Sequence, residues 1–157
     1  MKIKLVTIGK TDSKQLSQLI DLYKKRLSHY IRFEFETIPD LKNTKNMSEA
    51  QQKEKEGELL ISSLQKADRV ILLDEKGKSF TSEGFAEQLQ KIMNAGTREL
   101  AFVIGGPYGF SDAVYARADQ KISLSQMTLS HQMVRLFFTE QLYRAFTILK
   151  NEPYHHR

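Results

Sequence analysis

Two short runs in which every residue is apolar constrain the fold of this chain more than any other feature. Residues 70–73 read Val-Ile-Leu-Leu, and residues 100–104 read Leu-Ala-Phe-Val-Ile. A strand without polar side chains is typical of a parallel sheet in which helices cover both faces. The two runs therefore predict a buried sheet, with a loop expected from Asp74 onward and another after Ile104.

Segments with strand and helix periodicity alternate along the rest of the chain. The expected strands are residues 3–8 and 33–38, the second half-exposed near a sheet edge, and the expected helices are residues 16–30, 48–64, 85–93 and 131–150. This order predicts an α/β fold, a mostly parallel sheet with helices on both faces, in a single domain over residues 1–157. Ligands of such sheets lie beyond the carboxyl ends of the strands, where we expect the site.

Composition narrows the classes of function. The chain has no cysteine, which excludes disulfides and thiolate chemistry, and its four histidines have no acidic neighbours suited to a metal site. No apolar run approaches the ~20 residues of a membrane span and no signal peptide is visible, so we expect a cytoplasmic protein without a membrane partner. The net charge is +5, with both ends basic and the middle acidic, which suits a polyanion such as RNA or a simple lysine-rich surface.

Several helical features carry specific expectations. Ser48 and Gln51 fit a capping box, and the charge run of the helix that follows is interpreted as solvated surface. Gly96 is expected to end the next helix in a left-handed conformation, and Ser130 to cap the last one. That last helix is apolar around nearly its whole circumference, so its outer face needs a partner, most simply the same helix of a second copy. We therefore expect a homodimer.

Two loops are candidates for ligand binding. Gly105, Gly106 and Gly109 follow a buried strand, and glycine lets backbone groups approach a ligand closely. The spacing matches neither a Walker loop nor a dinucleotide fingerprint, so a tight turn is the alternative. Residues 122–129 are apolar yet rich in hydroxyls, and a short strand with a loop is the alternative there.

Charged residues interrupt the apolar last helix, and a mixed tail follows it. Arg135, Glu140 and Arg144 would be costly to bury unless they are paired or bind a ligand, so ion pairs across an interface are the alternative to a functional role. The tail, Tyr154 to Arg157, combines an aromatic ring, two imidazoles and a guanidinium. A disordered basic tail is the alternative.

Taken together, these segments resemble the SPOUT methyltransferases of the trefoil-knot class, and most closely the ribosomal RNA large subunit methyltransferase H family. The resemblance covers the whole chain and is carried by five blocks in order. These are Leu72-Leu73-Asp74 with Gly77-Lys78; Phe102 to Pro107 with Gly109; Ser123-Leu124-Ser125 with Met127-Thr128; His131 and Arg135 through Tyr143-Arg144-Ala145; and Tyr154-His155.

The resemblance implies methylation of N3 of a pseudouridine in 23S rRNA, with S-adenosylmethionine (SAM) as cofactor and a knot threaded by the C-terminal helix. It implies cofactor binding by Leu73, Gly105, Leu124, Ser125, Gln126, Met127, Thr128 and Leu129. Rivals are a SPOUT enzyme for another RNA nucleotide, since a fold does not fix its substrate, and a non-catalytic ribosome-associated RNA-binding protein.

A chemical hypothesis follows for the remaining residues. N3 of pseudouridine must lose a proton, which His131 or His155 could accept. Arg135 and Arg144 could stabilise negative charge on the ring carbonyls, and Tyr154 could stack on the base. Because the tail is distant in sequence from the cofactor loops, we expect one subunit to supply the cofactor and the other the tail.

Overall fold

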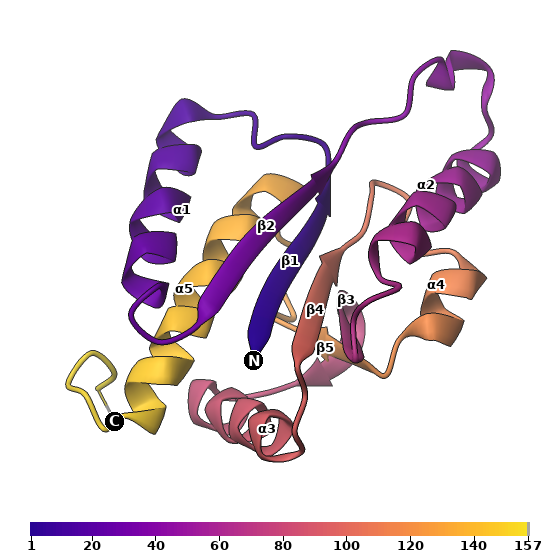
Figure 1. Cartoon of the computed structure of the whole chain (residues 1–157). Helices are drawn as coiled ribbons and strands as arrows, with labels where there is room; N and C mark the ends of the chain where they lie inside the picture. The colour runs from indigo at the N-terminus through magenta and orange to yellow at the C-terminus, as the bar shows by residue number, and fades with distance from the viewer. Residues whose placement is uncertain (157) are drawn as a thin grey trace.

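The computed structural model describes residues 1–156 and contains a five-stranded sheet in the order β2-β1-β4-β3-β5 (Figure 1). Every pair of neighbouring strands is parallel, as the sequence predicted. The strands are β1 (Lys2–Ile8), β2 (Arg32–Ile38), β3 (Arg69–Ser79), β4 (Glu99–Ile104) and β5 (Gln120–Ser123). The two wholly apolar runs form the adjacent strands β3 and β4, and the half-exposed strand β2 is an edge.

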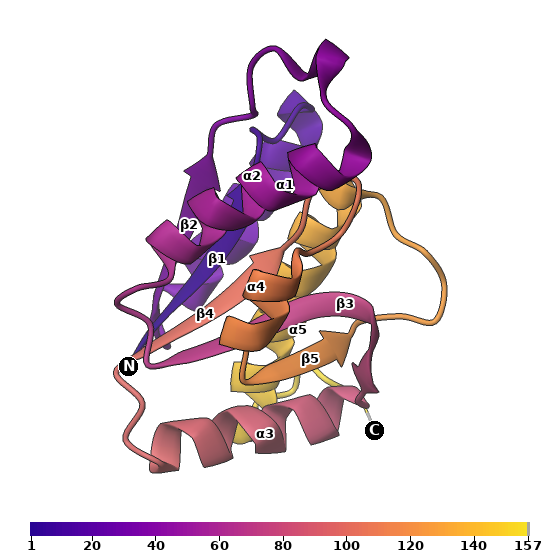
Figure 2. The ribbon, with the colours of Figure 1, turned by 90° about the vertical axis from the view of Figure 1, so that its right-hand side faces the viewer.

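Helices cover both faces of this sheet, as expected (Figures 1 and 2). Helices α1, α3 and α5 share one apolar core with Ile3, Leu5 and Phe102, and α2 and α4 share a second core with Val70 and Leu72. The helices are α1 (Lys14–Leu27), α2 (Glu49–Ser63), α3 (Ser82–Asn94), α4 (Asp112–Arg117) and α5 (His131–Leu149), with a short 3-10 helix η1 (Thr44–Asn46) before α2.

Local sequence signals set the ends of the helices. Ser48 and Gln51 form the predicted capping box, and the Ser130 hydroxyl accepts from the backbone N–H of Met133 at 3.1 Å. Gly96 has a φ of +80°, the left-handed conformation expected at the end of α3. These three predictions are confirmed.

The expectation that β3 ends at Leu73 is wrong. The strand continues to Ser79, with an irregularity after Leu73, and its last residues pair with β5 through Lys78 with Ile122 and Ser79 with Ser123. This part of β3 tolerates charged residues because its partner β5 is short and lies at the sheet edge, where charged side chains reach solvent. The irregular segment 74–77 therefore bulges beside β5 rather than forming a free loop.

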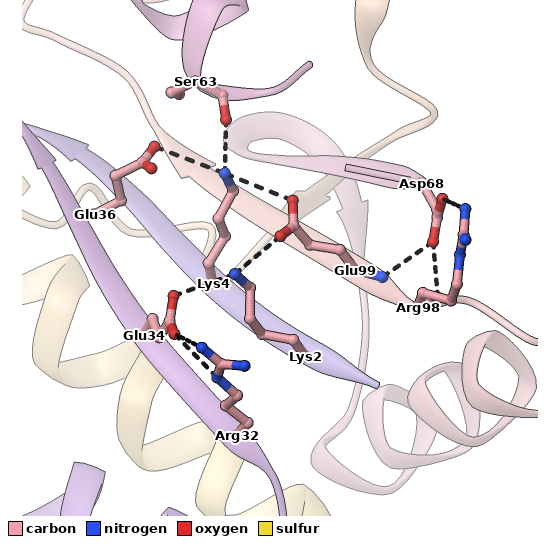
Figure 3. Close-up of polar contacts among 9 residues, drawn as sticks. All are labelled: Lys2, Lys4, Arg32, Glu34, Glu36, Ser63, Asp68, Arg98 and Glu99. Carbon is pink, nitrogen blue, oxygen red and sulfur yellow. Dashed lines mark hydrogen bonds and ion pairs between the residues drawn. The ribbon is translucent and has the colours of Figure 1, made fainter. Parts of the chain in front are cut away.

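A charged cluster occupies the part of the sheet beyond the end of α2 (Figure 3). The buried Lys4 donates to the carbonyl of Ser63 at 2.6 Å, and its Nζ lies 3.7 Å from Oε2 of Glu99. Lys2 Nζ lies 3.0 Å from the other oxygen of Glu99 and 3.3 Å from Glu34. Ion pairs thus link the first three strands in sheet order, β2, β1 and β4, where the apolar core stops.

Asp68 closes the turn before β3. Its carboxylate accepts from the backbone N–H groups of Arg98 at 2.8 Å and Glu99 at 3.1 Å, and pairs with the Arg98 guanidinium (Figure 3). These backbone hydrogen bonds are the main cause that lowers the pKa of Asp68 below its ordinary 3.8. The carboxylate thereby ties the starts of β3 and β4 together.

Helix α5 lies against α1 and α3, and its burial is uneven. Phe138 and Leu142 are fully buried, whereas Met133 is 47% exposed on the face away from the sheet. Part of the apolar surface that led us to expect a partner therefore does face outward. Across residues 1–156, no helix has the length and apolar character needed to span a membrane.

Candidate functional site

A pocket of about 570 Å³ opens beyond the carboxyl ends of β4 and β5, beside the irregularity in β3 that follows Leu73. Its walls come from the 73–76 segment, the 104–110 loop, two residues of α4, the loop that joins β5 to α5, the first turn of α5 and one residue of α2. Figure 2 shows the β5–α5 loop leaving the sheet beside the end of β3 and returning to the start of α5. This volume and position are typical of small-molecule sites in parallel α/β sheets.

The pocket brings together most of the residues predicted to bind a cofactor. Those that line it are Leu73, Gly105, Leu124, Ser125, Met127, Thr128 and Leu129. Gln126 is exposed in the same loop and is not among the lining residues. His131, predicted as a proton acceptor, lines the pocket from the start of α5.

The glycine loop is compact because its backbone folds on itself. The N–H of Gly109 donates to the carbonyl of Gly106 at 3.1 Å, and Gly109 has a φ of +85°. A side-chain carbon on Gly105 would lie 3.1 Å from the ring of Phe110. Phe110 therefore packs closely against the loop, and residues 105–110 together form one wall of the pocket.

Hydroxyl groups shape the β5–α5 loop. Ser123 Oγ donates to the carbonyl of Ser125 at 3.0 Å, and Ser125 Oγ accepts from the N–H of Met127 at 2.9 Å. Met127 is 80% exposed, so this loop presents an apolar side chain at the pocket rim. The two serine hydroxyls thus hold the conformation of the loop that lines the pocket.

Sequence reasoning missed a polar pair on the pocket wall. The Tyr115 hydroxyl donates to Asp74 at 2.5 Å, and both side chains line the pocket. Burial, followed by this hydrogen bond, raises the pKa of Tyr115 to about 12. The position of Asp74 after a buried strand was a usable signal, whereas Tyr115 on α4 gave none.

Arg135 is 2% exposed and is not among the residues that line the pocket. Its guanidinium donates to the carbonyls of Gly9 at 2.9 Å and Ile8 at 3.0 Å, and its Nε donates to the carbonyl of His131. Burial lowers the pKa of this guanidinium below its usual range. These contacts join the end of β1 to the start of α5, which favours a positioning role over direct contact with an RNA base.

Arg144, Tyr154 and His155 form a separate cluster at the far end of α5. Arg144 donates to Glu140 at 2.6 Å and lies 3.2 Å from Nδ1 of His155. Tyr154 donates to the same Glu140 oxygen at 2.8 Å, and burial is the main cause that raises its pKa. The rise of ~1.5 Å per helical residue puts Arg144 about 20 Å from His131, so one protomer does not bring this cluster to its own pocket.

The tail is packed against the helices that precede it. The ring of Tyr154 lies 4.7 Å from that of Tyr143, and its hydroxyl lies 3.3 Å from that of Tyr23 on α1. This packing replaces the alternative of a disordered tail for the part described. Arg157, the last residue of the predicted basic tail, lies outside the described residues.

Comparison with known proteins decides the family. Residues 1–155 match the family described as "Predicted SPOUT methyltransferase", which is almost the whole chain. The chain belongs to the SPOUT methyltransferase family. Relatives agree along the full length: a protein from Christiangramia forsetii named "Ribosomal RNA large subunit methyltransferase H" is 71% identical over 157 residues, covering 100% of both chains.

More distant SPOUT relatives carry the same name. Proteins from Cytophaga hutchinsonii and Porphyromonas gingivalis are 57% and 54% identical over 156 residues, and each alignment covers at least 99% of both chains. A solved structure described as a probable methylase family protein from Haemophilus influenzae matches with a TM-score of 0.58 at 13% identity, covering 99% of this chain and 70% of that chain. That likeness supports the fold.

Apolar, polar and charged residues together line the pocket. Among residues 1–156, no three His, Cys, Asp or Glu side chains are grouped so that they could hold a metal. The walls combine apolar side chains such as Leu73 and Leu124 with open main chain, the combination that small-molecule pockets use.

Proposed function

We propose that this chain methylates N3 of a pseudouridine in 23S rRNA, with SAM as the methyl donor. The observation that carries the proposal is the convergence of Leu73, Gly105 and the β5–α5 loop on one pocket in a SPOUT methyltransferase. The names of the relatives, which designate ribosomal RNA of the large subunit, support the substrate class. As an rRNA enzyme, the protein would act in the cytoplasm as one domain.

In this proposal the pocket residues bind and orient the cofactor. Leu73 and Leu124 would cover apolar parts of the cofactor, while the main chain of residues 105–109 would hydrogen-bond its polar edges. SAM supplies a methyl group on a cationic sulfur. Methyl transfer needs an in-line approach of the nucleophile, so positioning by these groups contributes much of the rate.

The pseudouridine must lose its N3 proton, and two histidines are candidates for accepting it. His131 lies at the pocket, whereas His155 lies beside Arg144 in the tail cluster. Arg144 would stabilise negative charge that develops on the ring carbonyls, and Tyr154 would stack on the base. Arg135 would act on this site indirectly, by fixing the backbone from which His131 projects.

We propose that a homodimer completes the site. The tail cluster is about 20 Å along α5 from the pocket of its own protomer, so the tail of a second copy would have to supply it. The exposed Met133 and the half-buried Leu136 and Phe137 of α5 are the apolar surface that the second copy would cover. Threading of α5 through a trefoil knot belongs to the same proposal and rests on the family resemblance.

Mass spectrometry of 23S rRNA tests the reaction. Ribosomes from a strain that lacks the gene are incubated with the protein and methyl-labelled SAM, and the rRNA is digested to nucleosides. We expect one methyl group per rRNA, on N3 of a pseudouridine. Label on a different nucleotide would contradict the assigned target, and absence of label together with absence of SAM binding would favour a non-catalytic RNA-binding protein.

Subunit complementation tests the shared site. A Thr128→Trp variant fills the pocket from an exposed loop position, and a second variant lacks residues 154–157. Each alone should be inactive. Random pairing after co-expression gives about one quarter of the wild-type activity, since half the dimers then hold one complete site. If the mixture is as inactive as its components, each site is built within one protomer.

A further inference from the structure

Glu56 on α2 lies behind the glycine loop of the pocket. Its side chain is 3% exposed, and a side-chain carbon built on Gly106 would lie 2.4 Å from its Oε1. Gly106 lines the pocket, whereas Glu56 is not among the lining residues. The backbone of Gly106 therefore lies between the carboxyl group and the cavity.

Close packing of α2 places this carboxyl group in the interior. A side-chain carbon on Gly57 would lie 2.3 Å from Oγ of Ser111, the residue that caps α4. Only glycine allows the helix to come so near, and the approach carries the neighbouring Glu56 with it. The expectation that the charge run of α2 is solvated throughout is thus wrong at Glu56.

Few hydrogen bonds offset the energetic cost of burying this carboxyl group. Its Oε2 accepts from Gln52 Nε2 at 3.4 Å, and its Oε1 has no hydrogen-bond partner among residues 1–156. Burial is the main cause that raises its pKa; the hydrogen bond from Gln52 lowers it, Asp40 raises it and His131 lowers it. An uncompensated buried carboxyl group destabilises a fold, which is a reason to look for a role.

We propose that Glu56 makes the pocket prefer the cationic methyl donor over the neutral product of the reaction. This inference rests on the proposed use of SAM. In the transfer, the lone pair of N3 forms the new bond to carbon, the carbon–sulfur bond breaks with its electron pair on sulfur, and the N3 proton passes to a base. The donor therefore loses its sulfonium charge, and S-adenosylhomocysteine (SAH) remains.

The hydrogen bond from Gln52 and the charge of His131 both favour the ionised form of Glu56, and this anion close to the cavity distinguishes the two ligands. Its attraction for a sulfonium is screened little by solvent, whereas a thioether has no charge to attract. Unit charges about 10 Å apart at an effective dielectric constant of ~20 change binding by roughly tenfold. Glu56 thereby favours departure of the product and its replacement by fresh donor.

Isothermal titration calorimetry measures this preference directly. SAM and SAH are titrated separately into the full-length protein without RNA, so no methyl transfer occurs. The variants are Glu56→Gln, which keeps shape and hydrogen bonding, and Glu56→Met, which removes both charge and polar atoms. Glu54→Gln is the matched control, because it removes the same charge from the exposed side of the same helix.

We expect the ratio of the Kd of SAH to the Kd of SAM to fall about tenfold in both Glu56 variants and to stay at the wild-type value in the control. Neither variant should melt below the wild type, since each removes an uncompensated charge. An unchanged ratio in Glu56→Gln, with both ligands still bound, overturns the inference and leaves the proposed function standing. A wild-type protein that binds neither ligand overturns both.

Discussion

Replacing Gly77 by alanine tests how tightly β3 is held against β5. A side-chain carbon there would lie 2.6 Å from the backbone N of Ile122 and 2.6 Å from the carbonyl carbon of Lys121. Backbone atoms cannot rotate away as a side chain can, so the two strands must separate locally. The pairs Lys78 with Ile122 and Ser79 with Ser123 follow directly and would be disturbed.

The expected loss in the free energy of unfolding is the sum of two contributions. Overpacking costs about 1–3 kcal/mol, and weakened ladder hydrogen bonds add about 1 kcal/mol. Gly77→Ala should therefore lower the free energy of unfolding by about 2–4 kcal/mol. For a domain of this size, this lowers Tm by about 4–16 °C. SAM affinity should fall as well, because residues 74–76 line the pocket.

Differential scanning calorimetry checks this prediction, with Gly84→Ala as the matched control. Gly84 lies in α3, where an added carbon would be 3.2 Å from Oγ1 of Thr81 and 3.6 Å from the ring of Phe80. Alanine is the better helix former, so the control should change stability by less than about 1 kcal/mol, toward stabilisation. Equal Tm values for the two variants would refute the reasoning about the β3–β5 contact.

Three further variants probe other parts of the molecule. Arg135→Met should lower the free energy of unfolding in urea by about 2–4 kcal/mol, since two buried carbonyls lose their donors; a smaller loss than in an exposed Lys-to-Met control would contradict this. The pKa of Tyr115 is raised from 10.0 to about 12, so its contribution to stability is complete below pH 10 and is lost as pH rises toward 12. Tyr115→Phe should flatten that loss in pH-dependent unfolding. The lowered pKa of Asp68 contributes stability above pH 3.8 that is lost on further acidification, so Asp68→Asn should flatten the acid limb.

Local signals in the sequence were enough for most of the fold. Apolar runs identified β3 and β4, and Ser48 and Ser130 identified helix starts, because each signal acts within a few residues. The position of the pocket followed from the sheet itself, since parallel strands carry their ligands beyond their carboxyl ends. Seven of the eight expected cofactor residues line that pocket.

Long-range contacts escaped prediction. The extension of β3 depends on pairing with β5, and the partners of Arg135 are backbone carbonyls at the other end of the chain. Glu56 looked like one of several solvated charges, and only the approach allowed by Gly57 buries it. Helical periodicity cannot report which face meets a distant loop, so these three features needed the structure.

The bridge between Lys4 and Glu99 bears on the order in which the protein folds during synthesis. Lys4 enters the interior on the first strand to be translated, whereas Glu99 arrives with β4, after three helices and two further strands. Until then β1 lacks its inner neighbour, and the ammonium group of Lys4 has Glu36 of β2 but not yet Glu99 as a counterion. Chains arrested before residue 99 should consequently remain protease-sensitive, with commitment to the native topology deferred until late in translation.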